Sequence, residues 1–84
     1  MKRKTIREIC RAWRLTREQE IFLTLYMTGG YSMIEAYRYA FPQSRATSGM
    51  ASLASHLLSI LEPVALQIAD AVRGNGVPLP KKYQ

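Results

Sequence analysis

The chain has 84 residues, of which 48% are hydrophobic, and it carries a formal net charge of +6 with a pI near 9.9. This length allows one small domain with one modest core, and the hydrophobic content favours folding over disorder. The single cysteine, Cys10, excludes an internal disulfide and leaves no cysteine framework for structural zinc. The positive balance indicates a polyanionic partner, unless the charge serves solubility alone.

No apolar run approaches the roughly 18 residues that a membrane span requires. The basic N-terminus is not followed by the apolar segment of a signal peptide. We therefore expect an intracellular protein with no membrane partner.

The positive charge is concentrated in residues 1–17, where seven Lys or Arg residues and one Glu account for the whole net charge. A helix over residues 1–14, at about 100° per residue, would place four arginines in one narrow sector beside an apolar sector. These arginines are Arg3, Arg7, Arg11 and Arg14. We predict that this basic amphipathic helix binds nucleic-acid phosphates. A solvated basic face and membrane-surface binding are the alternatives.

The next helix is predicted over residues 15–30. Thr16 followed by Gln19 has the spacing of a capping box, in which two side chains satisfy free amides at a helix start. Gly29 and Gly30 predict the end of this helix, because glycine readily adopts the left-handed conformation past a helix terminus.

A short helix, a proline corner and a longer helix are predicted over residues 32–60. Ser32 and Glu35 have capping-box spacing, and Pro42 ends the short helix because the residue before a proline avoids the α region. We expect Ser44 to cap the longer helix. Its apolar stripe comprises Ala46, Met50, Leu53, Ala54, Leu57, Leu58 and Leu61. This pattern is typical of a helix-turn-helix, whose second helix enters the DNA major groove.

Pro63 begins the last predicted helix, residues 63–73, because proline is favoured in a first helical turn. Two prolines and two lysines in the last eight residues predict an extended, flexible tail. The predicted fold is therefore all-α, a small four- to five-helix bundle containing a helix-turn-helix. Its parts are a basic N-terminal helix (1–14), a helix-turn-helix DNA-binding domain (15–74) and a flexible C-terminal tail (75–84).

The sequence offers no evident catalytic constellation. It has one His, one Cys and no clustered carboxylates, whereas a nucleophile needs a nearby base and a metal needs several ligands. His56 lies among serines and leucines, and no Gly-rich phosphate loop is present. We therefore expect a binding module and not an enzyme, with no cofactor and no metal.

The segments LTREQEIF (15–22), TGG (28–30) and EAYRYA (35–40) resemble the N-terminal domain of phage small terminase subunits. That family opens with a Leu-Thr-x-x-Gln-x-x-Phe motif and continues through a Tyr and a Gly to an Ala-Tyr-Arg-x-Ala-type helix. ASHLL (54–58) and EPV (62–64) are similar to its later motifs. At the turn, where the family usually has Gly-Tyr-Ser, this chain has FPQS (41–44).

The resemblance implies recognition of double-stranded viral DNA for genome packaging in the cytoplasm of a bacterial host cell. It also implies the large terminase subunit as a partner, and homo-oligomers. Small terminases normally continue into an oligomerisation segment, whereas one predicted helix and a short tail follow here, so an isolated domain and a shortened relative both stay open. Two other classes are a phage or bacterial helix-turn-helix transcription regulator and a protein-interaction module that binds an acidic partner.

On the helix-turn-helix hypothesis, Arg45 and Ser48 contact base edges from the start of the longer helix, where an arginine can pair with guanine O6 and N7. Ser44 and the free amides of that helix start would hold a phosphate. Arg38 would touch the backbone from the supporting helix. The predicted DNA-binding residues are Arg3, Arg7, Arg11, Arg14, Arg38, Ser44, Arg45, Ser48 and Ser52.

Overall fold

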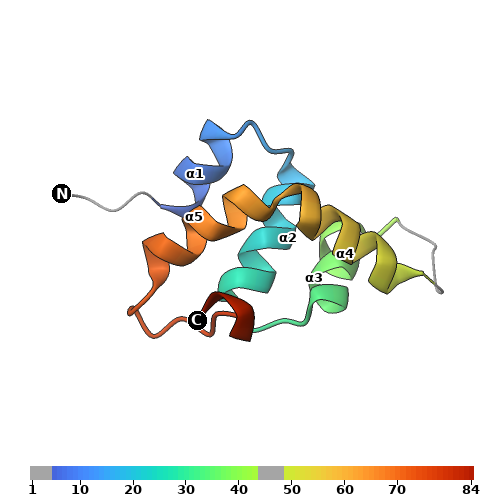
Figure 1. The fold of residues 1–84 in the computed structure, drawn as a ribbon. Helices are drawn as coiled ribbons and strands as arrows, with labels where there is room; N and C mark the ends of the chain where they lie inside the picture. Colours follow the sequence, from blue (N-terminus) through green and yellow to red (C-terminus); the bar gives the residue numbers. More distant parts are fainter. Residues whose placement is uncertain (1–4, 44–48) are drawn as a thin grey trace.

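The computed structural model describes residues 5–43 and 49–84. In these two segments the chain forms five α-helices and one short 3-10 helix (Figure 1). They are α1 (Ile6–Ala12), α2 (Arg17–Thr28), α3 (Met33–Ala40), α4 (Met50–Ile60), α5 (Glu62–Val72) and η1 (Lys81–Tyr83). The described residues contain no strand, so the prediction of a small all-α bundle is confirmed.

Helix α1 is amphipathic, as predicted, but it is shorter than residues 1–14. Thr5 caps it by accepting a hydrogen bond from the Glu8 amide at 3.2 Å, and the helix ends at Ala12. Its apolar side buries Ile9 and Cys10, and the helix packs against α5 and α2. The exposed face of α1 carries Arg7 and Arg11 of the predicted basic surface.

A left-handed residue turns the chain from α1 toward α2. Arg14 has a φ of 56°, the one positive φ among the described non-glycine residues. The Arg14 amide donates to the Arg11 carbonyl and the Leu15 amide donates to the Cys10 carbonyl, each at 3.0 Å. These two bonds define a Schellman motif in which Arg14 holds the position that glycine usually takes. Arg14 therefore does not continue the helical sector of Arg7 and Arg11, which corrects the prediction.

Both predicted capping boxes are present. Thr16 accepts from the Gln19 amide while the Gln19 side chain accepts from the Thr16 amide, and Ser32 and Glu35 make the same reciprocal pair. Gly29 is the C-cap of α2. The starts of α2 and α3 are thus fixed by local hydrogen bonds, as their sequence spacing indicated.

The longer helix begins later than the sequence suggested. Helix α3 ends at Ala40 with Phe41 as its C-cap, before the predicted proline corner, but α4 begins at Met50. Its N-cap is Gly49, with a φ of 84° and no side-chain cap bond. Ser44, proposed as the cap, lies outside the described residues.

Helices α4 and α5 meet at Leu61, where their axes bend by 74°. In the part of the chain that the structure describes, no single helix has the length and apolar character to cross a membrane. The α4–α5 pair reaches that length and composition only when its two bent arms are taken together.

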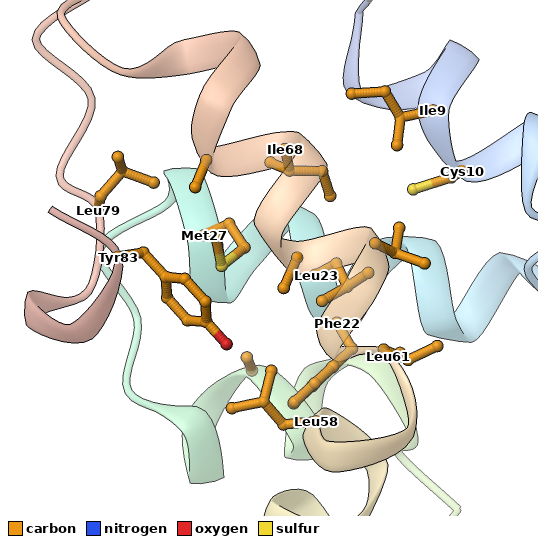
Figure 2. Close-up of a cluster of buried hydrophobic side chains, with 14 of the residues drawn as sticks. Ile9, Cys10, Phe22, Leu23, Met27, Leu58, Leu61, Ile68, Leu79 and Tyr83 are labelled. Atoms are coloured by element: carbon orange, nitrogen blue, oxygen red, sulfur yellow. The ribbon is translucent and has the colours of Figure 1, made fainter.

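The core lies between α2 and α5, with α1, α4 and the C-terminal segment around it (Figure 2). Phe22, Leu23 and Met27 of α2 and Ile68 of α5 are fully buried. Figure 2 shows Tyr83 pointing into this cluster beside Met27 and Leu58. The core therefore includes a side chain from the end of the chain.

Residues 77–84, which we call the C-terminal strap, fold back onto the bundle. Leu79 and Tyr83 are buried, with exposed fractions of 7% and 2%. The Tyr83 hydroxyl donates to Glu62 Oε2 at 2.7 Å, and the Lys82 ammonium lies 3.7 Å from the same oxygen. Arg73 donates to the Tyr83 carbonyl at 3.2 Å. These contacts correct the prediction of an extended tail, because the strap joins both ends of α5.

Candidate nucleic-acid interface

Three arginines from two helices surround one surface hollow of about 630 Å³. Arg7 and Arg11 come from α1, and Arg17 is the first residue of α2. We call this the basic hollow; Leu15, Glu20 and Ile21 complete its lining. The Schellman motif and the capped start of α2 position these side chains, because together they fix the turn between the two helices.

The arginines of the basic hollow are exposed and take part in none of the ion pairs within residues 5–43 and 49–84. The pairs found there join Arg73 to Asp70 at 2.7 Å and Lys82 to Glu62. A guanidinium without a carboxylate partner keeps its donors available, and its planar fork suits the two oxygens of a phosphate. The hollow is thus chemically suited to an anionic group.

Helix α1 also carries a buried thiol, that of Cys10. Burial, and then the negative charge of Glu20, raise the pKa of the Cys10 thiol to about 11. The thiol is therefore protonated near neutral pH, and since the thiolate is the reactive form, Cys10 acts as a small packing residue.

The connection between α1 and α2 is anchored to α5. Trp13 is 45% exposed, and its indole Nε1 donates to Gln67 Oε1 of α5 at 3.0 Å. Arg14, beside it, is exposed but does not line the basic hollow. Of the predicted N-terminal arginines, the structure therefore brings Arg7 and Arg11 together and leaves Arg14 apart.

Helix α4 presents a polar outer face. Ser52, Ser55 and Ser59 are exposed and, at about 100° per residue, fall within a sector of about 60°. Met50, Ala54 and Leu58 are buried on the other side. Arg38 is exposed in the last turn of α3. Ser52 is thus on the surface.

The predicted site forms two surfaces. Figure 1 shows α1 and α4 toward opposite ends of the molecule, with α5 extending between them. The start of α2 lies near both helices, since Arg17 lines the basic hollow and Thr16 lines a separate hollow beside α4, on a different side of α4 from its serines. The predicted residues outside the described segments are Arg3, Ser44, Arg45 and Ser48.

Arg17 lines the hollow but is not among the predicted DNA-binding residues. It lies in the basic segment of residues 1–17, directly after the predicted helix cap Thr16. The short connection between Ala12 and Arg17 could have indicated this position, because it keeps the first turn of α2 close to the end of α1.

The described residues contain no group of three or more His, Cys, Asp or Glu side chains that could hold a metal ion. Comparison of the chain with protein-family models, curated proteins and solved structures finds no match. The class that the structure defines is a small all-α bundle with an arginine-lined hollow.

Proposed function

We propose that this protein is a DNA-binding module and not an enzyme. The observation that carries the proposal is the basic hollow, in which Arg7, Arg11 and Arg17 converge from two helices without ion pairs among the described residues. Phosphate contacts by arginine supply much of the affinity of proteins for duplex DNA. The chain's +6 charge would attract such a polyanion over a longer range.

Helix α4 is the proposed recognition helix, and α3 the supporting helix of a helix-turn-helix. Support comes from the proline corner that ends α3 and from the exposed serines of α4, whose hydroxyls can bond to several base edges. In this arrangement Ser52 contacts the major groove of the DNA and Arg38 contacts the adjacent DNA backbone. The basic hollow holds phosphates further along the duplex.

We further propose that the DNA is viral, that the role is genome packaging and that the protein acts in the cytoplasm of a bacterial host cell. The support is the resemblance of residues 15–22 and 35–40 to small terminase motifs. The large terminase subunit and further copies of the chain are partners on this proposal. A transcription regulator with the same helix pair would normally bind a palindrome as a dimer, so selected sites without half-site symmetry favour packaging.

The direct experiment is an NMR titration of the protein with a short DNA duplex at low salt. We expect the largest amide shifts in two groups, the residues around the basic hollow and the serine face of α4. The amides of Arg73 and Tyr83 in and beside the strap serve as the internal control and should shift little. Shifts confined to the strap side, or an unchanged spectrum, would contradict the proposal.

A further inference from the structure

A groove follows α4 on a different side from its serine face. Two adjoining hollows of about 460 and 440 Å³ form it, and both are lined by Glu18, Tyr37 and Phe41. Thr16 and Gln19 of α2 line one edge, and α4 forms the facing wall. We call this the α4 groove. Its larger apolar lining residues are Tyr37, Phe41, Leu53, Leu57 and Ile60.

The α4 wall leaves large aliphatic side chains uncovered. Leu53 is 42% exposed and Ile60 is 59% exposed. They are seven residues apart and so lie two turns apart on one side of α4, with Leu57 between them. Single exposed aliphatic residues are common, but a row of them along a hollow is the arrangement that binds an amphipathic helix.

The described lining of the groove carries a charge opposite to that of the chain. Among the described residues that line its two hollows, Glu18 alone is formally charged, and it is exposed at the first turn of α2. It forms no ion pair within the described segments. A DNA phosphate or an acidic segment would be repelled at this position, whereas a lysine or arginine would be attracted. The electrostatics therefore favour a protein segment with a cation near its apolar side chains.

The two outer faces of α4 point in different directions. At about 100° per residue, the centre of the serine face lies roughly 120° from the Leu53–Ile60 row. The core-facing residues Met50 and Ala54 occupy the remaining sector. A helix docked in the groove would therefore leave Ser52, Ser55 and Ser59 accessible.

We propose that the α4 groove docks an amphipathic helix of a protein partner. The helix inserts aliphatic side chains along Leu53, Leu57 and Ile60 and places a lysine or arginine beside Glu18. This surface is separate from the basic hollow, so the inference does not rest on DNA binding. It would give α4 a second function, connecting the bundle to a partner protein while its serine face is free.

A displayed library of amphipathic helices tests this inference. The library is selected for binding to the wild-type protein and counter-selected against the Leu53→Ser/Ile60→Ser variant. We expect the enriched sequences to carry aliphatic residues at i, i+3 or i+4, and i+7, together with at least one cation. A synthetic peptide of the enriched sequence should bind the double variant at least about tenfold more weakly, a difference of about 1.4 kcal/mol.

Two matched variants separate the contribution of the aliphatic row from that of the Glu18 charge. Leu66→Ser removes an aliphatic residue that is 48% exposed on α5, outside the lining of both hollows, and should leave peptide affinity unchanged. Glu18→Gln should weaken binding of the cationic peptide by roughly threefold, as for an exposed ion pair, and should not weaken binding of a peptide whose cation is replaced by glutamine. Circular dichroism melting verifies that each variant is folded.

Three results would overturn the inference. One is the absence of any enriched sequence whose binding depends on Leu53 and Ile60. Another is enrichment of acidic sequences. The third is sedimentation of the protein alone as a dimer that the Leu53→Ser/Ile60→Ser variant disrupts, since the groove would then be occupied by a second copy of the chain.

Discussion

Arg73 and Lys82, in and beside the C-terminal strap, each have a carboxylate partner, whereas Arg7, Arg11 and Arg17 around the basic hollow have none in the described segments. The strap also buries two apolar side chains, and the basic hollow is open to solvent. The cations in and beside the strap thus help to position the chain, whereas the arginines of the basic hollow have donors available for a ligand. We expect substitutions at the strap to change stability and substitutions at the hollow to change DNA affinity.

The largest expected effect follows from removing the strap's aromatic anchor. Tyr83→Ala should lower the free energy of unfolding by about 3–5 kcal/mol, the usual range for truncating a buried aromatic side chain. Urea denaturation followed by circular dichroism measures this change. Arg11→Ala, at an exposed position, should stay within about 0.5 kcal/mol of wild type. Equal losses in the two variants would remove the distinction between the regions.

A smaller loss should follow from removing the Tyr83 hydroxyl alone. In Tyr83→Phe the ring still fills its site, but the 2.7 Å hydrogen bond to Glu62 disappears. Hydrogen bonds to charged groups contribute about 1.5–3 kcal/mol, and partial exposure of Glu62 places the expected loss near 1–2 kcal/mol. The same denaturation series measures it. An unchanged midpoint would indicate that the hydroxyl contributes nothing to docking of the strap.

Alkaline pH should lower the stability of the protein through two buried groups, Cys10 of α1 and Tyr83 of the strap. The pKa of Cys10 rises from about 9 to about 11 on folding, and burial followed by the hydrogen bond to Glu62 raises the pKa of Tyr83. Each group stays protonated in the folded protein at a pH where the unfolded chain has lost the proton. Stability should therefore be fully present below about pH 9 and decrease as the pH rises toward 11.

Denaturation midpoints between pH 7 and pH 11 measure this dependence. Cys10→Ala should flatten the curve between about pH 9 and pH 11, and Tyr83→Phe should flatten the part that begins near pH 10, the ordinary pKa of tyrosine. If both variants keep the full wild-type decrease of stability with pH, groups other than Cys10 and Tyr83 cause that decrease.

A small gain in stability is expected from replacing Arg14. Because a left-handed residue with a side chain is strained, Arg14→Gly should raise the free energy of unfolding by up to about 1 kcal/mol. Arg14 does not line the basic hollow, so its loss should reduce DNA affinity less than Arg11→Ala does, although both remove one positive charge. Equal losses of affinity would mean that net charge matters more than position.

The parts of the fold that the sequence predicted correctly depend on residues close together in the chain. Two capping boxes, the glycine end of α2 and the end of α3 before Pro42 each involve a few neighbouring residues. The errors involve distant residues. Leu79 and Tyr83 looked unstructured because their proline- and lysine-rich surroundings suggest a tail, but the site they fill is assembled from elements far away in the sequence.

Two surface features were hidden for related reasons. Leu53 belongs to the apolar stripe of α4 by periodicity, but the side of the stripe that it occupies faces a groove and not the core. Arg17 looked like a helix-start residue, and only the turn at Arg14 brings it to Arg7 and Arg11. Periodicity orients residues around one helix, but it does not tell which other helix covers them.

If the arginines of the basic hollow bind DNA phosphates, the affinity of the protein for a DNA duplex should depend on salt concentration through these side chains. Fluorescence anisotropy gives the Kd of wild type, Arg11→Ala and Lys81→Ala over a series of salt concentrations. Lys81→Ala is the matched control, since it also removes one exposed cation but belongs to the strap. We predict that the log–log slope decreases by about 0.9 in Arg11→Ala and is unchanged in Lys81→Ala. Equal slopes for all three proteins, or a wild-type affinity independent of salt, would contradict the account.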